Sequence, residues 1–259
     1  MSVANASDIK ANAYIITDAS GITLASKNAK SIKSIASITK LMTAIVILEE
    51  RLPDNELLQI TIDDVDNIKH SSSRLSIGSL LYRDTMLKLA LMSSENRAAH
   101  ALARTSPGGV HSFVEKMNAQ AKLLGMHDTR FVDPTGLSEN NVSTASDLAK
   151  LVAAAAQYKK IKEYSTTKEY YVHDKKFINT NPLARGDNSW PLTISKTGFT
   201  QEAGRCVAMN TRIGNRETIM VILNSPTKES RTKDANRLKL YLSGNNNTKN
   251  NKKVSISKA

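Results

Sequence analysis

Cysteine is nearly absent from this sequence. Cys206 is the only one in 259 residues, so the chain cannot form an internal disulfide in any compartment. Its neighbours Val207, Ala208 and Met209 are apolar, and we expect Cys206 to be a small buried side chain. Long apolar runs are absent too, because no stretch approaches the roughly twenty apolar residues that a membrane-spanning helix needs.

Aromatic residues are scarce at 5%, and basic residues outnumber acidic ones, which leaves a formal charge of +12. A basic chain suits an anionic partner, which could be nucleic acid, a membrane surface or a cell-wall polymer with free carboxylates. The basic residues are not interleaved with aromatics, and this distribution argues against nucleic acid. The hydrophobic fraction of 40% is that of a soluble globular protein with one large domain or two lobes.

Several common catalytic motifs are missing. No Gly-x-Ser-x-Gly elbow occurs, so a Ser-His-Asp hydrolase has no nucleophile to build on, and glycine-rich phosphate-binding loops are absent. The histidines show no metal-ligand spacing, and we expect surface or satisfied core positions for His70, His100, His111, His127 and His173. The sequence therefore implies no metal ligand set.

One serine–lysine pair lies where the most apolar segment begins. Residues 41–48 predict a buried helix, with Lys40 at its start and Ser37 three residues earlier. Residues three apart share a helix face, so this hydroxyl and amine can come within hydrogen-bonding distance. A serine hydroxyl is a poor nucleophile without a base, and a buried lysine near a second cation can be neutral and act as that base.

The spacing alone leaves a second interpretation open, in which Ser37 is an N-cap residue and Lys40 is exposed to solvent. Ser-x-x-Lys also recurs in this chain. We expect a solvated surface at the other copies, which are Ser165/Lys168, Ser225/Lys228, Ser230/Lys233 and Ser255/Lys258. Only the Ser37 copy begins a long apolar helix.

Two further motifs follow in order along the chain. A Ser-Glu-Asn motif at residues 94–96 comes after the apolar run 86–92, and a Lys-Thr-Gly motif at residues 196–198 comes after the strand-like segment 190–195. Ser-x-x-Lys, Ser-x-Asn and Lys-Thr-Gly in this order are typical of penicillin-binding proteins and serine β-lactamases.

The local sequence narrows this resemblance. The chain resembles the low-molecular-mass D-alanyl-D-alanine peptidases, and within them the penicillin-binding protein 7/8 group, the D-alanyl-D-alanine endopeptidases. The resemblance covers about residues 8–242 and rests on residues 36–44, 91–99, 133–138 and 196–200.

The residue patterns alone indicate an α+β chain. Residues 12–17 and 22–26 predict a β-hairpin around Gly21, and residues 206–211 and 217–223 predict strands paired across a turn. The resemblance implies the β-lactamase/DD-peptidase fold, an antiparallel sheet flanked by helices with an inserted all-helical lobe. We expect a domain at 8–242, comprising a sheet lobe (8–36 and about 157–242) and a helical lobe (about 37–156), and a disordered tail at 243–259.

Local signals also mark the ends of helices. Asp84 or Thr85 is placed to cap the helix that ends near Ser93. The last helix is expected to end near Leu242, where the apolar residues stop.

The resemblance implies acyl transfer. Ser37 would attack the carbonyl of a D-alanine residue, Lys40 would take the serine proton, and water would release the acyl-enzyme. Ser94 would relay a proton to the leaving amine, and Asn96 would hold the substrate amide while bracing Lys40. Lys196 would raise the local positive potential, which favours neutral Lys40 and attracts a substrate carboxylate.

The resemblance also implies substrate-binding residues. The backbone N–H groups of Ser37 and Phe199 would stabilise the oxyanion. Thr197 would offer its hydroxyl to a substrate carboxylate, and Gly198 would let the substrate backbone lie against its strand. Arg231 matches a position where some relatives carry a carboxylate-binding arginine, while a solvated arginine at a helix start explains the residue equally well.

The implied function is a serine D-alanyl-D-alanine endopeptidase that cleaves peptidoglycan cross-links in the periplasm, with no metal and no organic cofactor. The implied partners are peptidoglycan stem peptides, and β-lactam antibiotics as covalent inhibitors, with no nucleic acid and no membrane span. Residues 1–8 lack the basic start and apolar core of a signal peptide, so we expect a mature exported form with an added Met1.

Three alternatives stay open. A D-alanyl-D-alanine carboxypeptidase is the nearest, but that subgroup commonly has a small residue where this chain has Glu95. A class A β-lactamase needs a glutamate two residues before Leu-Asn, a context that is missing at Glu115, Glu139, Glu163 and Glu169. A non-catalytic sensor would keep the site for binding only, and intact Lys40, Ser94 and Asn96 argue against it.

Overall fold

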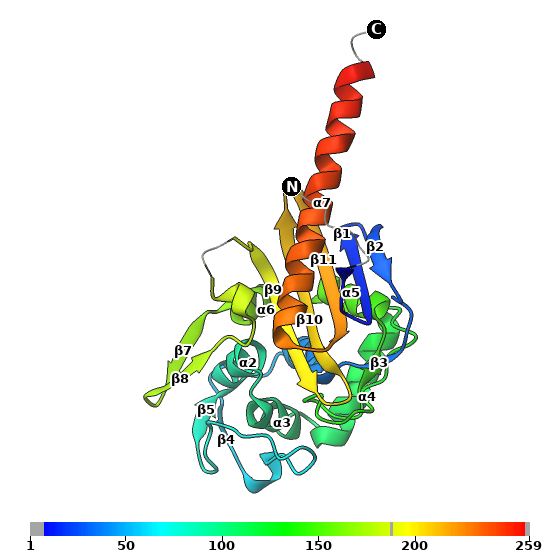
Figure 1. The fold of residues 1–259 in the computed structure, drawn as a ribbon. Helices are drawn as coiled ribbons and strands as arrows, with labels where there is room; N and C mark the ends of the chain where they lie inside the picture. The colour runs from blue at the N-terminus through cyan, green and yellow to red at the C-terminus, as the bar shows by residue number, and fades with distance from the viewer. Residues whose placement is uncertain (1–7, 187–188, 257–259) are drawn as a thin grey trace.

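The computed structural model describes residues 8–186 and 189–256, with side chains as far as Gly244. Its centre is a five-stranded antiparallel sheet in the order β2-β1-β11-β10-β9 (Figure 1). The strands are β1 (Ala13–Asp18), β2 (Thr23–Lys27), β9 (Leu192–Thr200), β10 (Gly204–Ile213) and β11 (Arg216–Ser225). The first strand pairs with the last, so the two ends of the domain meet within the sheet.

Helices and short strands make up the rest. The helices are α1 (Lys40–Glu49), α2 (Arg83–Met92), α3 (Asn96–Arg104), α4 (Gly109–Leu123), α5 (Ala145–Ala155), α6 (Lys159–Thr166) and α7 (Lys228–Ile256), with 3₁₀ turns η2 (Ala36–Thr39), η3 (Ile62–Asp64) and η4 (Pro182–Ala184). The short strands pair as β3 (Lys33–Ser34) with β6 (Val142–Ser143), β4 (Leu57–Gln59) with β5 (Leu80–Tyr82), and β7 (Glu169–Val172) with β8 (Lys175–Ile178). The predicted α+β class is therefore confirmed.

Both predicted hairpins are confirmed. β1 pairs with β2 across a turn that contains Gly21, whose φ of 85° favours glycine. β10 pairs with β11 as far as Ile213 and Arg216, which leaves Gly214 and Asn215 as a two-residue turn. This order leaves β9 at one edge of the sheet.

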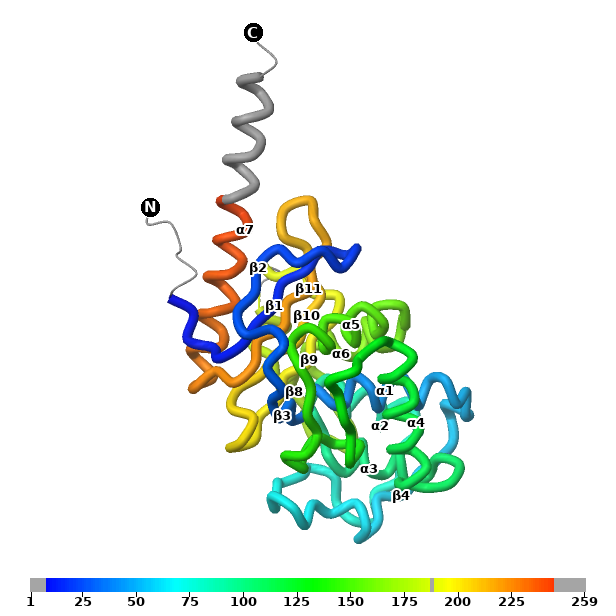
Figure 2. Tube along the Cα trace, turned by 90° about the vertical axis from the view of Figure 1, so that its right-hand side faces the viewer, coloured from blue at the N-terminus to red at the C-terminus, as the bar shows by residue number. Residues whose placement is uncertain are grey.

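Helices cover both faces of the sheet (Figures 1 and 2). α7 lies across one face, where Ala235 and Leu238 belong to the same apolar cluster as Trp190. α5 and α6 lie on the opposite face, α5 against β1, β10 and β11 and α6 against β9. Along β11, successive side chains from Ile219 to Leu223 alternate between the two apolar clusters, as expected of a strand buried on both faces.

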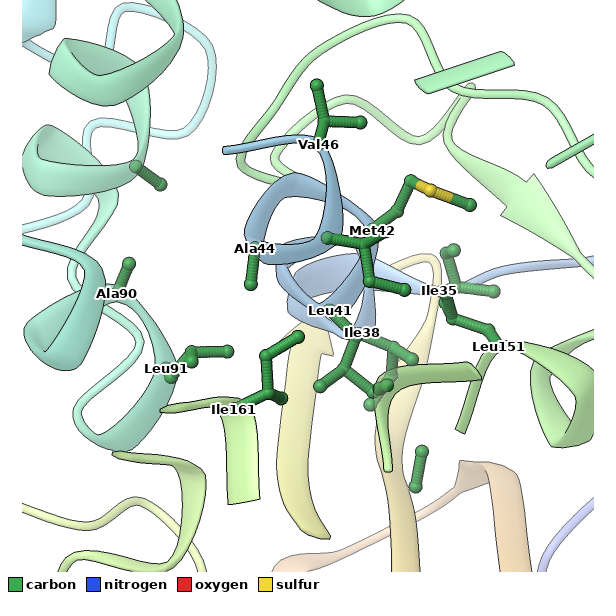
Figure 3. Close-up of a cluster of buried hydrophobic side chains, with 14 of the residues drawn as sticks. Ile35, Ile38, Leu41, Met42, Ala44, Val46, Ala90, Leu91, Leu151 and Ile161 are labelled. Atoms are coloured by element: carbon green, nitrogen blue, oxygen red, sulfur yellow. The ribbon is translucent and has the colours of Figure 1, made fainter. Parts of the chain in front are cut away.

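α1 is the apolar centre of the helical part (Figure 3). Its residues from Lys40 to Ile47 are all buried, which explains why the sequence shows no polar face here. Its side chains pack among those of α2, α5 and α6, including Leu91, Leu151 and Ile161. The turn η2 precedes α1 and packs against β9. The most buried helix thus holds the preceding turn against the edge strand of the sheet.

One local prediction is wrong. α2 begins at Arg83 with Tyr82 as its N-cap, because the carboxylate of the predicted cap Asp84 instead accepts hydrogen bonds from Lys160 and Tyr164. β9 runs through the Lys-Thr-Gly motif to Thr200, in agreement with the expectation that Gly198 lies on a strand.

The prediction for the C-terminal segment after β11 agrees only in part with the structure. α7 runs to Ile256, past the helix end expected near Leu242. The predicted disordered tail, residues 243–259, falls mostly outside the described side chains and stays a prediction, as does the division into lobes. Within the described residues, no helix combines the length and the apolar character needed to cross a membrane.

Candidate active site

Three segments far apart in the sequence bring the predicted site residues to one cleft. Ser37 lies in η2, Ser94 and Asn96 lie at the turn between α2 and α3, and Thr197 lies in β9. The cleft has a volume of about 840 Å³, and its lining includes the predicted residues Ser37, Ser94, Asn96, Thr197, Gly198, Phe199 and Arg231. The two predicted lysines, Lys40 and Lys196, lie beneath this surface, and each is only 1% exposed.

The backbone around Ser37 is tightly packed. Ala36, directly before it, has a φ of 47°, in the left-handed region that residues with a Cβ rarely adopt. A Cβ on Gly136 would lie 2.0 Å from the Ala36 carbonyl oxygen, and a Cβ on Gly198 would lie 3.1 Å from the Ser37 nitrogen. Both glycines therefore make room for the turn that carries Ser37. The expected approach of a substrate backbone to Gly198 stays a prediction.

The amine of Lys40 contacts three oxygen atoms. Its Nζ lies 2.9 Å from Ser37 Oγ, and it donates hydrogen bonds of 2.7 Å to Asn96 Oδ1 and 2.7 Å to the Thr135 carbonyl. An amide oxygen and a backbone carbonyl can only accept hydrogen bonds. A neutral amine has two N–H groups and one lone pair, so donation to these two acceptors leaves the lone pair facing Ser37 Oγ. This arrangement suits a base that takes the serine proton.

Burial away from water also favours a neutral Lys40. Burial lowers its pKa from the ordinary 10.5 to about 7, against the opposing attraction of Asp133, Glu95 and Asp66. A substantial fraction of the amine is therefore unprotonated near neutral pH. The alternative of a capping serine with an exposed lysine is wrong, because no side-chain cap is formed at η2 and Lys40 is buried.

Lys196 forms a second buried amine site. Its Nζ donates hydrogen bonds of 2.9 Å to Ser94 Oγ and 2.9 Å to the Thr197 carbonyl. Burial, followed by repulsion from Lys40 and Arg231, lowers its pKa well below the ordinary value. Since each lysine disfavours charge on the other, the pair favours states with fewer than two positive charges.

The sequence missed a group of residues that support these contacts. The Asp133 carboxylate accepts hydrogen bonds from the backbone of Thr135, Gly136 and Ser138, and this turn places the Thr135 carbonyl at Lys40. These residues lie in the segment 133–138, which supported the family resemblance. The sequence could therefore have indicated that this segment supports the site.

A loop residue was missed as well. Asn96 Nδ2 donates to Ser71 Oγ at 2.9 Å, and the Ser71 backbone N–H donates to Asp66 at 2.8 Å. The loop before α2 therefore fixes the orientation of Asn96. Only the serine-rich composition marked this segment, which is a signal for a loop and carries no information about its contacts.

Arg231 lies at the cleft but is not solvated. It is 4% exposed, its Nη1 donates to the Cys206 carbonyl at 3.3 Å, and its Nη2 has no hydrogen-bond partner among the described residues. Burial lowers its pKa to about 10, so the guanidinium stays charged at neutral pH. The solvated-arginine alternative is therefore wrong, and Nη2 is a buried, unpaired cationic donor on a residue that lines the cleft. Cys206 itself is fully buried, as expected.

Thr197 and Phe199 complete the wall formed by β9. Thr197 Oγ1 donates to Thr180 Oγ1 at 2.6 Å, so two hydroxyl groups face the cleft where one was predicted. Phe199 is 49% exposed, and the guanidinium of Arg205 lies 3.4 Å from the centroid of its ring. No group of three or more His, Cys, Asp and Glu side chains among the described residues is placed to hold a metal ion.

Comparison with known proteins agrees with this geometry. The family model described as D-alanyl-D-alanine carboxypeptidase, peptidase S11, matches residues 1–227. The chain is 44% identical to a D-alanyl-D-alanine endopeptidase of Pseudomonas aeruginosa, over 91% of this chain and 78% of that protein. It is 46% identical to a D-alanyl-D-alanine endopeptidase of Escherichia coli, over 82% of this chain and 70% of that protein.

The fold is also that of a solved relative. Penicillin-binding protein D2 from Listeria monocytogenes, in its cefotaxime-bound form, superposes with a TM-score of 0.79 at 29% identity. The match covers 90% of this chain and 98% of that one. Both the predicted fold and the predicted family are confirmed, and the chain belongs to the D-alanyl-D-alanine carboxypeptidase family of serine peptidases, peptidase S11.

Proposed function

We propose that this protein is a serine D-alanyl-D-alanine endopeptidase that hydrolyses peptidoglycan cross-links through an acyl-enzyme on Ser37. The observation that carries the proposal is the position of Lys40 Nζ, buried and 2.9 Å from Ser37 Oγ, with a pKa lowered to about 7. The choice of the cross-link as substrate is supported by the two relatives named above, which are both endopeptidases.

Acylation starts from neutral Lys40. Its lone pair takes the Ser37 hydroxyl proton while Ser37 Oγ forms a bond to the carbonyl carbon of the D-alanine residue. The negative charge that develops on the carbonyl oxygen is received by the backbone N–H groups of Ser37 and Phe199. Lys40 now holds the proton as an ammonium ion.

Collapse of the tetrahedral intermediate breaks the bond between the carbonyl carbon and the leaving nitrogen. Ser94 gives its hydroxyl proton to the leaving amine and takes a proton back from the lysine pair, with which it is in contact through Lys196 Nζ. One proton leaves Ser37 and one reaches the amine, so the charge of the lysine pair returns to its starting value. Asn96 keeps Lys40 in place throughout, because its Oδ1 accepts a hydrogen bond from Nζ.

Water then releases the acyl group. Neutral Lys40 takes a proton from the water molecule as the water oxygen attacks the ester carbonyl carbon. The bond to Ser37 Oγ breaks, the proton returns to Ser37, and a peptide with a free D-alanine carboxyl group departs. Arg231 and the hydroxyl of Thr197 hold the carboxylate next to the bond that is cut, because both face the cleft and the arginine has an unpaired Nη2.

A β-lactam reacts with Ser37 in the same acylation step. Its strained amide carbonyl acylates Ser37, and the amine that is released stays tethered to the acyl group. The cefotaxime-bound relative supports binding of such a ligand by this fold. Because peptidoglycan lies outside the cytoplasmic membrane, the proposed substrate implies a periplasmic protein.

The function is tested with purified cross-linked peptidoglycan dimers. The protein and its Ser37→Ala variant are incubated with dimers, and the products and the intact protein are followed by mass spectrometry with and without a β-lactam. We expect dimers to become monomers only when Ser37 is present, and we expect the β-lactam to leave a lasting adduct on that serine.

A carboxypeptidase is the second candidate, since the matching family model carries that description. Loss of only a terminal D-alanine in the same experiment would establish it in place of the endopeptidase. A β-lactam adduct without cleavage of any peptide would show a protein that only binds.

A further inference from the structure

The cleft is lined by cations and by no acid. Among its described lining residues, none is Asp or Glu, while the basic members are Lys69, Arg185, Arg205, Lys228 and Arg231. Lys69 is paired with Glu202, and Arg231 is buried and bonded to the backbone. The side chains of Arg205 and Lys228 have no hydrogen bond or ion pair with any residue that the structure describes. These two cations are the subject of the inference.

Arg205 is held in place without using its N–H groups. It lies opposite Phe199 in the register between β10 and β9, and its guanidinium stacks 3.4 Å from the centre of that ring. Stacking occupies the face of the guanidinium and leaves its edge, with the N–H donors, available. A fixed guanidinium edge at a cleft binds a carboxylate by two parallel hydrogen bonds.

Lys228 supplies a second charge beside it. It is the first residue of α7 and lies three positions before Arg231, so the two share a helix face at the cleft. The neighbouring acid Glu229 is exposed and does not line the cleft, but it lies near enough for the charges of Lys228 and Arg205 to help lower its pKa, after backbone and Thr227 hydrogen bonds. Arg205 and Arg231 lie close enough for the charge of one to lower the pKa of the other. Arg205, Lys228 and Arg231 thus form one cationic group on the cleft lining.

The presence of cations beside Arg231 matters for the leaving group. When the leaving group is a single D-alanine, it ends at the carboxylate that Arg231 and Thr197 receive. When the substrate is a cross-link, the leaving amine belongs to a residue that continues into a second peptide strand. A strand that continues past Arg231 would have Arg205 and Lys228 as neighbouring cations.

The path beyond them is also basic. A hollow of about 600 Å³ shares Phe199 and Gln201 with the cleft, and its described lining contains Lys10 and Lys27 and no acid. A strand that leaves the cleft over Phe199 therefore enters a second cationic surface. This continuity favours an extended anionic peptide over a small ligand.

We propose that Arg205 and Lys228 form a subsite for a free carboxylate on the leaving strand of a cross-linked peptide. This subsite rests on the proposed endopeptidase function and adds its substrate class: dimers whose leaving strand carries unamidated carboxyl groups. Arg231 binds the carboxylate beside the bond that is cut, and the new subsite binds one further along the same strand.

The test compares two synthetic dimers that differ only in the leaving strand, with its carboxyl groups either free or amidated. In Arg205→Gln, kcat/KM for the free-acid dimer is expected to fall about tenfold, mainly through KM, and for the amidated dimer less than about twofold. Arg212→Gln is the matched control, because Arg212 is exposed on the same strand β10 and does not line the cleft. That control is expected to behave as wild type with both dimers.

The outcomes separate the subsite from the function. Equal losses with both dimers would overturn the subsite and show that Arg205 only supports Phe199; an unchanged free-acid rate would overturn it too. The rate of acylation by a β-lactam checks that Arg205→Gln is folded with an intact site. Failure of the wild-type protein to cleave either dimer would overturn the proposed function and the subsite together.

Discussion

Lys40 has three polar neighbours, and at the scale of single residues this small set decides the chemistry. Two of them, the Asn96 amide oxygen and the Thr135 carbonyl, accept hydrogen bonds and cannot give a proton back. Ser37 is the only one that can donate a proton to the amine. Proton transfer from Ser37 therefore needs no rearrangement of the site, only the unprotonated form of Lys40.

The first prediction is a pH profile. Since burial lowers the pKa of Lys40 to about 7, the amine is protonated and inactive below that value and neutral above it. The rate of acylation by a β-lactam should therefore rise about tenfold per pH unit below pH 7 and level off above it. Stopped-flow measurements over the range in which the protein stays folded would check this. A rate that keeps rising beyond pH 9 or so would show an ordinary lysine pKa and contradict the geometry.

The second prediction concerns Gly136. Alanine there would place a Cβ 2.0 Å from the Ala36 carbonyl oxygen at a φ of 83°, so the turn before Ser37 must move. We expect Gly136→Ala to cost more than about 3 kcal/mol of unfolding free energy and to abolish acylation.

Gly21→Ala is the matched control for this substitution, because Gly21 has a φ of 85° and no atom within 4 Å of the added Cβ. It should cost only about 1 kcal/mol, from backbone strain alone. Denaturant unfolding of both variants provides the comparison. Equal costs would show that the close approach to Ala36 contributes nothing.

Single residues also show what sequence could and could not reveal. Ser37 and Lys40 were found because their chemistry needs two particular residue types at a fixed spacing. The Thr135 carbonyl was not found, because a backbone group leaves no trace in residue type. The partner of Asn96, Ser71, lies on a loop whose contacts depend on the tertiary structure, so no local pattern could have indicated it.

At the scale of elements, α7 is tied to the beginning of the chain. The fully buried carboxylate of Asp234 accepts hydrogen bonds from the backbone N–H groups of Lys10 at 3.1 Å and Ala11 at 2.8 Å. These residues lead into β1, which pairs with β11 in the sheet. One side chain thus connects the last helix, the first strand and the sheet between them.

The third prediction follows from this connection. Asp234→Ala would leave the buried N–H of Ala11 and the partly buried N–H of Lys10 without this partner, and we expect it to lower the free energy of unfolding by about 2 kcal/mol. Lys233→Ala is the control, because Lys233 is the exposed neighbour on the same helix and should change stability by less than about 0.5 kcal/mol. Chemical denaturation measures both. A loss of similar size in the two variants would show that helix propensity, and not the tie to β1, explains the effect.

Helices and strands with a strong apolar pattern were predicted well. The ends of strands were predicted less well, because hydrogen bonding with the neighbouring strand determines them. α1 and the two hairpins carry clear periodicity and turn residues. The strand that carries Lys196 and Gly198 was expected, but its end could not be predicted from the local sequence. Hydrogen bonding with β10 extends this strand to Thr200, which puts Phe199 on the cleft wall.

At the scale of the whole molecule, the cleft lies between the sheet and the helices, and an ion pair joins its two walls. Lys69 Nζ lies 2.5 Å from Glu202 Oε1. Lys69 belongs to the loop that contacts Asn96 through Ser71, and Glu202 belongs to the turn between β9 and β10. Both side chains are about a third exposed, at 33% and 31%, so solvent screens the pair.

The fourth prediction uses the double variant Lys69→Gln/Glu202→Gln, which leaves the net charge unchanged. Exposed ion pairs contribute little to stability, so we expect almost no change in the unfolding midpoint. Release of muropeptides from intact peptidoglycan should rise about twofold or more relative to cleavage of a soluble dimer, since only the large substrate needs a wide entrance. Parallel assays on the two substrates give this ratio. An unchanged ratio would show that the pair does not restrict entry.

The Lys69–Glu202 contact bridges two walls of the cleft. A strand within a continuous covalent net has no free end near the bond that is cut, so it cannot pass under this contact from one end. Entry of such a strand would require the contact to break. An exposed ion pair costs little free energy to break, whereas separating a buried one would leave uncompensated charges and cost far more.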